Sequence, residues 1–226
     1  MTKLQTDHHL LGEGDSLPPL QSCILDLEGT LFYSAAFKKG TLQQAVACIA
    51  NKLSLPTHSA EHSLHSARKA LAMKVGYEPS LSATVCSFGI SLDEWAIYQS
   101  RVGIEKTIDR DEEIRRAVSH LYSAYSVSVY TNMNTAMAQA ALSYLGILDG
   151  LRNLITPQVV GHTKPSPEAV DHLIARGVFF PRTTVAIGDR YSIDIQPITA
   201  VGGWGYLTKS RGDLLSFLKR LISLEA

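Results

Sequence analysis

Three short apolar runs, each ending in polar residues, limit the fold of this chain more than any other feature. They are SCILDL (22–27), VSVYTN (127–132) and TVAIGD (184–189). Apolar runs of this length, bounded by turn residues, are typical of strands that a parallel sheet buries on both faces. A weaker candidate of the same kind covers residues 151–156, and a short strand is expected at 205–207.

Helix-like segments separate these runs. One segment with Ala and Leu at helical spacing stops before Gly146, a residue suited to ending a helix. Ser166 followed by Pro167 is a typical helix start, and further helices are expected at 192–201 and 212–224. The alternation of strand and helix predicts an α/β protein, a Rossmann-like parallel sheet with helices on both faces.

The ends of the predicted strands carry the residues of chemical interest. Parallel sheets bind ligands in the crevice outside the carboxyl ends of their strands. Asp26, Thr131 and Asp189 each stand at such an end. We therefore expect these three side chains to converge on one crevice, with the sheet acting as the scaffold that holds them.

Residues 35–110 depart from the alternation and show helical periodicity instead, interrupted by glycines and prolines. We interpret this stretch as a small α-helical cap domain inserted after the first strand. The α/β core would then comprise residues 20–34 and 111–226. The polar stretch 1–19, broken by Gly and Pro, is expected to be a flexible N-terminal tail.

The charge balance and the cysteines bear on partners and compartment. Lys plus Arg number 21 and Asp plus Glu number 21, so neither nucleic acid nor a membrane surface is expected as a partner. No apolar run is long enough to span a bilayer, and the first residues lack the apolar centre of a secretory signal. Cys23, Cys48 and Cys86 form no CxxC pair and are expected to be reduced residues of a cytoplasmic protein.

Four motifs follow one another along the chain with long gaps between them: DLEGTL (26–31), YTN (130–132), KP (164–165) and GDRYSID (188–194). Together they resemble the four signature motifs of the haloacid dehalogenase-like (HAD) hydrolase superfamily, most of whose members are phosphatases. The helical stretch sits where that family carries a cap between its first and second motifs. The resemblance implies a magnesium-dependent phosphatase that hydrolyses a small phosphomonoester, such as a nucleotide or a sugar phosphate, through an aspartyl-phosphate.

The resemblance also implies roles for individual residues. Asp26 would attack phosphorus, and Glu28 would act as general acid and base. Thr131, the Asn132 backbone and Lys164 would bind the phosphoryl group. These residue types suit the chemistry, because a phosphomonoester dianion repels an anionic nucleophile and the site must neutralise charge while it aligns the attack.

A magnesium site is implied by the same resemblance. Its ligands would be the Asp26 carboxylate, the Glu28 backbone carbonyl and Asp189. Asp194 would stand behind these ligands or reach the ion through water. Mg²⁺ prefers oxygen ligands and is commonly held in proteins by one or two carboxylates together with waters.

Glu28 departs from the usual motif, since most family phosphatases have Asp two residues after the nucleophile. Glu keeps the carboxyl group and extends it by one methylene, so acid–base catalysis stays open with altered geometry. Branches that attack carbon–halogen or carbon–phosphorus bonds usually place Tyr or Ala there, so Glu28 favours phosphate-ester hydrolysis. The alternatives are a phosphotransferase or a dehalogenase of the same fold, or a catalytically inactive binding protein.

Charged residues of the helical stretch leave further options open. His58, His62 and His65 share one helical face and could ligate a transition metal, but a solvated polar face is the favoured interpretation. Four cations of the same stretch are candidates for holding an anionic substrate, and the sequence selects none of them: Arg68, Lys69, Lys74 and Arg101. Neither the substrate nor the oligomeric state follows from the residues.

Overall fold

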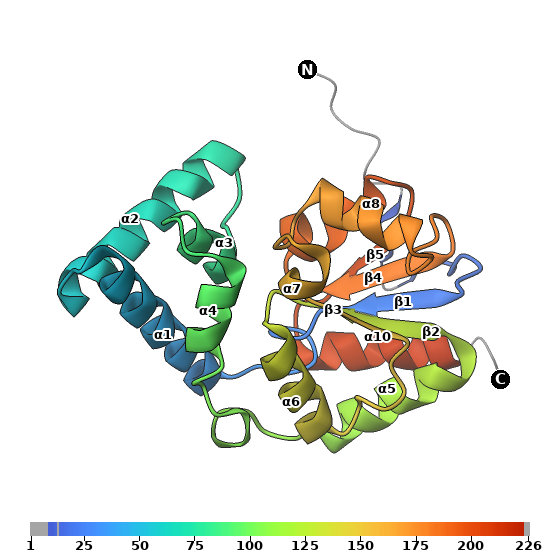
Figure 1. Cartoon of the computed structure of the whole chain (residues 1–226). Coiled ribbons are helices and arrows are strands. Elements are labelled where there is room, and N and C mark those ends of the chain that lie inside the picture. The colour runs from blue at the N-terminus through green and yellow to red at the C-terminus, as the bar shows by residue number, and fades with distance from the viewer. Residues whose placement is uncertain (1–8, 13, 224–226) are drawn as a thin grey trace.

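The computed structural model describes residues 9–12 and 14–223, and its centre is a five-stranded sheet (Figure 1). All neighbouring strands are parallel, and their order across the sheet is β3-β2-β1-β4-β5. In chain order the strands are β1 (Ser22–Leu25), β2 (Ser126–Tyr130), β3 (Asn153–Ile155), β4 (Thr184–Gly188) and β5 (Trp204–Leu207). The structure confirms the predicted α/β class, with strands somewhat shorter than the apolar runs.

The register of the three central strands places their carboxyl ends side by side. Leu25 of β1 is aligned with Val129 of β2 and with Ile187 of β4. Neighbouring strands lie roughly 4.8 Å apart. Residues that follow these strand ends, such as Asp26 and Asp189, are therefore held within reach of one another by the sheet itself.

Helices cover both faces of the sheet (Figure 1). One face is covered by α5 (Glu112–Ala124), α6 (Thr135–Leu145) and α10 (Arg211–Ser223), and the other by α8 (Pro167–Ala175) and the short α9 (Gln196–Thr199). A further short helix, α7 (Pro157–Val160), follows β3. Alternate residues of β1 serve the two faces, since Cys23 and Leu25 join the first apolar core and Ile24 joins the second. This two-sided burial is why the strand has no polar side.

Four helices form a separate group with its own apolar core, here called the helical unit: α1 (Ala35–Leu53), α2 (Thr57–Val75), α3 (Leu81–Cys86) and α4 (Leu92–Gln99). Ile49, Leu64 and Trp95 are almost fully buried in that core. Figure 1 shows the unit at the end of the sheet toward which the arrowheads of β1 and β4 point. The 3₁₀ helix η2 (Ile104–Lys106) lies on the way back to α5. None of the described helices combines the length and the apolar character needed to cross a bilayer.

The segment after β4 differs from the helix expected over 192–201. It begins as a π-helical turn, η3 (Tyr191–Ile195), and only then continues as α9. Pro197 has no N–H and cannot bond to the carbonyl four residues before it. The Gln196 N–H bonds instead to the Tyr191 carbonyl, five residues back. Such wide turns are often found at functional sites, and this one carries Asp194.

Part of the expected N-terminal tail packs against the sheet. Leu10 forms a parallel bridge with Gly205 of β5, and the Leu11 N–H donates to the Gly205 carbonyl at 2.8 Å. Leu11 is buried, and the His9 ring lies 4.8 Å from that of Trp204. Residues 9–11 therefore extend the edge of the sheet, because burial of Leu11 and the contact of His9 with Trp204 hold them there. Residues 1–8 and 13 of the expected tail lie outside the described residues.

Candidate active site

A cavity of about 610 Å³ lies where the carboxyl ends of the central strands face the helical unit. The site residues that the four motifs indicated all line it: Asp26, Glu28, Thr131, Asn132, Lys164, Asp189 and Asp194. The helical unit contributes Lys38, Arg68 and Gln99, among others. The structure thus brings four distant motifs together. It adds Arg68, one of the four candidate cations of the helical stretch, and Lys38 and Gln99, which the sequence did not indicate.

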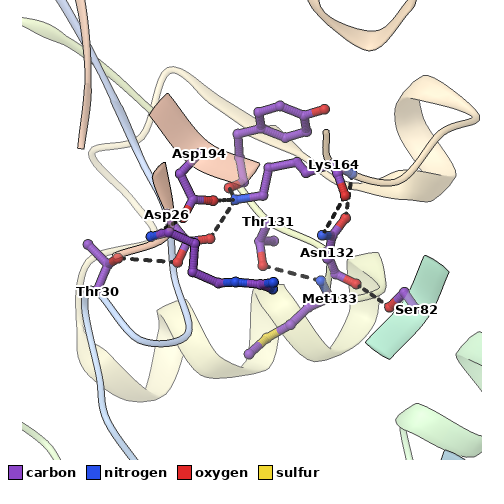
Figure 2. A network of polar contacts seen from close by, with 10 residues as sticks. Asp26, Thr30, Ser82, Thr131, Asn132, Met133, Lys164 and Asp194 are labelled. Atoms are coloured by element: carbon purple, nitrogen blue, oxygen red, sulfur yellow. Dashed lines mark hydrogen bonds and ion pairs between the residues drawn. The ribbon is translucent and has the colours of Figure 1, made fainter. Parts of the chain in front are cut away.

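Lys164 stands at the centre of the polar network (Figure 2). Its ammonium donates to Asp26 Oδ1 and Asp194 Oδ1 at 2.6 Å each, and to the Tyr130 carbonyl at 2.8 Å. The side chain is only 3% exposed. Burial alone would lower the pKa of Lys164, but the carboxylates of Asp194 and Asp26 outweigh it and hold that pKa above its usual range. The site therefore contains a permanent, fully hydrogen-bonded cation.

Asp26 follows β1 directly and is buried. Its N–H donates to the Ile187 carbonyl at 2.9 Å, and the Thr30 hydroxyl donates to its second carboxylate oxygen at 3.2 Å. Burial and the neighbouring Asp194 raise the pKa of Asp26 to about 7, although Lys164 acts in the opposite direction. One cation is thus too little to offset the negative charge gathered here.

Asp26, Asp189 and Asp194 offer carboxylate oxygens that lie within 4.8 Å of one another. Asp189 Oδ1 is enclosed and has no hydrogen-bond partner in the described part of the chain, which is unusual for a buried polar atom. Both oxygens of Asp194 are engaged, one by Lys164 and the other by the Arg190 N–H at 3.0 Å. These residues fit a magnesium ion held by Asp26 and Asp189, with Asp194 positioning the groups around it.

Gly29 has a structural reason to be glycine. Its φ of +91° is in the region that side chains disfavour, and a Cβ there would lie 2.5 Å from Asp189 Oδ2. The turn after β1 therefore passes directly against the Asp189 carboxylate. This close approach accounts for the glycine of the DLEGT motif without any assumption about chemistry.

The loop after β2 presents hydrogen-bond donors to the cavity. The Thr131 hydroxyl accepts from the Met133 N–H at 3.2 Å, so its own proton is free to be donated elsewhere. The Asn132 N–H has no acceptor within the described residues. The Asn132 side chain pairs with the backbone of Lys164, accepting at 2.7 Å and donating at 3.2 Å (Figure 2). Asn132 thereby ties the loop to the segment that carries the central lysine.

Glu28 lines the cavity but lies nearer to solvent than the buried carboxylates. Surrounding protein and the charge of Asp189 raise the pKa of Glu28, while Lys38 and Arg190 act to lower it. A carboxyl group of this kind can hold a proton and exchange it with water. Its position, two residues after Asp26, places it on the same turn as the buried aspartate.

Comparison with known proteins decides the family. The sequence model of the haloacid dehalogenase-like hydrolases matches residues 20–202, most of the chain. The chain belongs to this family. Among curated proteins, none is similar enough in sequence to match.

Solved structures of HAD hydrolases share the fold. A HAD phosphatase from Thermococcus onnurineus has a TM-score of 0.58 at 17% identity, over 89% of this chain and 98% of that one. The putative HAD-hydrolase YfnB from Bacillus subtilis, bound to magnesium, has a TM-score of 0.55 at 14% identity, over 88% and 99%. A 2-haloacid dehalogenase from Pseudomonas syringae has a TM-score of 0.54 at 18% identity, over 92% and 100%. At such identities the likeness extends to the fold, and the fold serves both phosphatases and dehalogenases.

The structure of this HAD hydrolase also shows contacts that sequence reasoning missed. The Ser82 hydroxyl of α3 donates to the Asn132 carbonyl at 3.0 Å and accepts from the Trp95 indole at 2.9 Å. Gln99 of α4 accepts from the Asn134 backbone N–H at 2.7 Å and from its side-chain amide at 3.0 Å. Ser82, Gln99 and Asn134 are all buried. The helical unit is thus hydrogen-bonded to the same loop that offers donors to the cavity.

The remaining metal candidates of the sequence lie elsewhere. His58, His62 and His65 are exposed on α2. Within the described residues, only Asp26, Asp189 and Asp194 form a group of three potential ligands close enough to hold an ion. The solvated polar face therefore accounts for the histidines. Cys23 and Cys48 are buried free thiols, and Cys86 is a partly buried one.

Magnesium is expected to stabilise this hydrolase more at pH 8 than at pH 5. With its raised pKa, Asp26 in the folded protein holds a proton up to about pH 7, whereas the unfolded chain releases it near pH ~4. The metal-free protein therefore loses stability as the pH rises through this window, and an ion that requires ionised carboxylates restores it. At saturating Mg²⁺ the melting temperature should rise by roughly 5 °C or more at pH 8, with a much smaller rise at pH 5.

Differential scanning fluorimetry with and without MgCl₂ measures this difference. Asp189→Asn is the control variant, because it removes the enclosed carboxylate oxygen that lacks a partner. It should lose most of the magnesium effect at both pH values. An equal stabilisation of the wild type at pH 5 and pH 8 would contradict the assignment of this cluster.

Proposed function

We propose that this HAD hydrolase is a magnesium-dependent phosphatase that cleaves small phosphomonoesters through an aspartyl-phosphate on Asp26. The observation that carries the proposal is the arrangement around Lys164. Its ammonium is paired with the buried nucleophile candidate Asp26 and with Asp194, and the nearby Asp189 adds negative charge that a divalent cation would offset. The donors of the loop after β2 face the same cavity and suit phosphoryl oxygens.

Two displacements describe the reaction. In the first, a carboxylate oxygen of Asp26 bonds to phosphorus, the ester P–O bond breaks, and Glu28 gives its proton to the departing alcohol oxygen. In the second, water attacks phosphorus, its proton passes to Glu28, and the bond between phosphorus and Asp26 breaks. The products are the alcohol and inorganic phosphate, and the side chains return to their starting states.

The groups around Asp26 would have separate roles in catalysis. Lys164 neutralises part of the charge on Asp26 and on the phosphoryl group and keeps the carboxylate oriented. Thr131 and the Asn132 N–H donate to the phosphoryl oxygens. A magnesium ion held by Asp26 and Asp189, with the Glu28 carbonyl beside them, would supply the remaining positive charge and orient the phosphoryl group.

Phosphate-ester hydrolysis accounts for more of the site than dehalogenation does. Removal of a halide needs neither a proton donor for the leaving group nor a cluster of carboxylates suited to a cation. Here Glu28 can serve as the proton donor, and Asp26, Asp189 and Asp194 form the cluster of carboxylates. Phosphate-ester hydrolysis therefore gives Glu28 and the aspartate cluster a catalytic role that dehalogenation would not require.

The helical unit fits the role of a cap, the inserted domain expected over 35–110. It lies across the cavity from the carboxyl ends of the strands, and its closure over a bound substrate would exclude water during the first displacement. The limited volume of the cavity suits a small phosphorylated metabolite. We propose such a metabolite as the partner, and neither a nucleic acid nor a membrane surface.

The direct test is hydrolysis of p-nitrophenyl phosphate by the purified protein, with MgCl₂ and with EDTA. Release of nitrophenol in MgCl₂ and its loss in EDTA would support the proposal. Adding an acceptor alcohol shows whether the phosphoryl group is transferred to it instead of to water. Halide release from a 2-haloacid, with no hydrolysis of any of a panel of phosphomonoesters, would overturn it.

Replacing Glu28 by glutamine is expected to slow steady-state turnover by about 10²–10⁴-fold, as for loss of a general acid–base group. Nitrophenolate leaves without needing a proton, so the first displacement should survive and give a burst of one equivalent before the slow phase. Stopped-flow absorbance measures both phases. Glu61→Gln, an exposed change on α2, is the matched control, and equal loss of burst and steady state in E28Q would contradict the role of Glu28.

A further inference from the structure

The cavity has two parts of opposite character. Its floor holds the carboxylates of Asp26, Asp189 and Asp194 around Lys164. Its other part, bounded by the helical unit and here called the outer part, is lined by Lys38 of α1, by Arg68 of α2 and by Arg190, whose guanidinium reaches the Glu78 carbonyl. The acidic side chains facing this outer part are those of Glu28 and Glu78.

Arg68 is the best defined of these cations. One guanidinium nitrogen pairs with the Glu78 carboxylate at 2.9 Å, but the Arg68 side chain is only 29% exposed. Its Nε is enclosed and has no hydrogen-bond acceptor among the described residues. A guanidinium presents its N–H groups in a planar fork that matches a carboxylate or a phosphate, so a ligand oxygen would complete its bonding.

The cations of the outer part outnumber its carboxylates. Arg190 donates to the Glu78 backbone carbonyl, which holds that segment in place. Lys38 is exposed at the cavity and forms no hydrogen bond or ion pair through its ammonium in the described part of the chain. Glu78 has an exposed carboxylate, so water screens its pairing with Arg68.

The outer cations have no assigned part in binding the phosphoryl group. In the proposed function the phosphoryl group is bound by Lys164, by the loop after β2 and by the cation at the floor. The outer cations would then face the organic part of the substrate. A hydroxyl oxygen of a neutral sugar or of glycerol could accept from the enclosed Arg68 N–H, but an anionic substituent makes the stronger, charge-assisted bond.

We propose that the substrates of this cavity carry a second anionic group, a carboxylate or a further phosphate, on the organic part, and that Arg68 binds it with help from Lys38. This inference rests on the proposed phosphatase function. It selects one residue from the four cations of the helical stretch that the sequence left equal. Lys69, the next residue on α2, is exposed and does not line the cavity.

Pairs of substrates that differ in one anionic group test the inference. The values of kcat/KM are measured for 3-phosphoglycerate against glycerol 3-phosphate, and for fructose 1,6-bisphosphate against fructose 6-phosphate. The wild type should prefer the member with the extra charge in at least one pair, and the pair concerned identifies carboxylate or phosphate as the group bound.

Arg68→Gln should reduce that preference by roughly 10- to 100-fold, the usual effect of losing a charge-assisted hydrogen bond. The change should appear mainly in KM for the doubly anionic substrate. Lys38→Met should reduce the preference to a smaller extent, and its exposed position makes it an independent test should Arg68→Gln fold poorly. Lys69→Gln, which removes the same charge next to Arg68, should keep the wild-type preference.

Two results would overturn the inference while the phosphatase function stands: no preference in the wild type for either charged substrate, or equal loss for both members of a pair in Arg68→Gln and Lys38→Met. Failure of the wild type to hydrolyse any phosphomonoester in magnesium would instead remove the proposed function, and the inference with it.

Discussion

Asp26→Asn is expected to abolish phosphatase turnover and to leave the fold intact. The amide is a poor nucleophile and forms no stable phosphoryl adduct, so kcat should fall by a factor of about 10⁴ or more. The substitution keeps the shape of the side chain. Its oxygen can still accept from Lys164, and its amide can donate to the Thr30 hydroxyl, which now lies 3.2 Å from the carboxylate.

The thermal stability of the Asp26→Asn variant should not fall with its activity. Burial and Asp194 disfavour the charge on Asp26, so removing that charge should leave the melting temperature of the metal-free protein unchanged or slightly raised at pH 8. Hydrolysis of p-nitrophenyl phosphate and thermal melts measure the two effects on one sample. Asp171→Asn, an exposed change on α8, should alter neither. Activity within tenfold of wild type in D26N would exclude Asp26 as the nucleophile.

The largest expected loss of stability follows from Lys164→Met. Without the ammonium, the buried carboxylates of Asp26 and Asp194 would repel each other. Each would also lose its ion pair with Lys164, at 2.6 Å, because methionine cannot donate a hydrogen bond. Removing one partner of a buried ionic cluster typically costs about 3–5 kcal/mol. In a chain of this length such a loss lowers the melting temperature by roughly 10 °C. The loss should shrink at acid pH, where Asp26 takes up a proton.

Denaturant unfolding of the variant at pH 8 and pH 5 measures this loss. Adding Asp194→Asn to Lys164→Met should recover part of it, because the double variant has one buried negative charge fewer. Lys209→Met, at an exposed position, is the control for loss of a lysine. A fall of less than about 1 kcal/mol in K164M, too small for a buried ionic contact, would mean that the cluster contributes little to folding.

The sheet and the strand ends could be predicted because their signals are local. The apolar run before Asp26 and the glycine at 146 act within a few residues, and α6 indeed ends at Leu145 before a left-handed Gly146. The same applies to α8, which begins at Pro167 with Ser166 as its cap. Convergence of the strand ends then follows from parallel pairing alone.

Other parts of the site arise from contacts between distant segments, which no local pattern announces. The selection of Arg68 over Lys69 depends on how α2 turns toward the cavity. The hydrogen bond from Ser82 to Asn132 requires the helical unit to meet the sheet domain. Helix α5 was not among the predicted helices, although its acidic first turn, capped by Asp111, is a local signal of a helix start.

The bonds from Ser82 and Gln99 to the loop after β2 have a consequence for how the helical unit can move. If it swings away from the sheet domain, these buried polar atoms separate and each has to be hydrated by water instead. The unit should accordingly stay docked for most of the time, and any opening should also loosen the loop that carries Thr131 and Asn132.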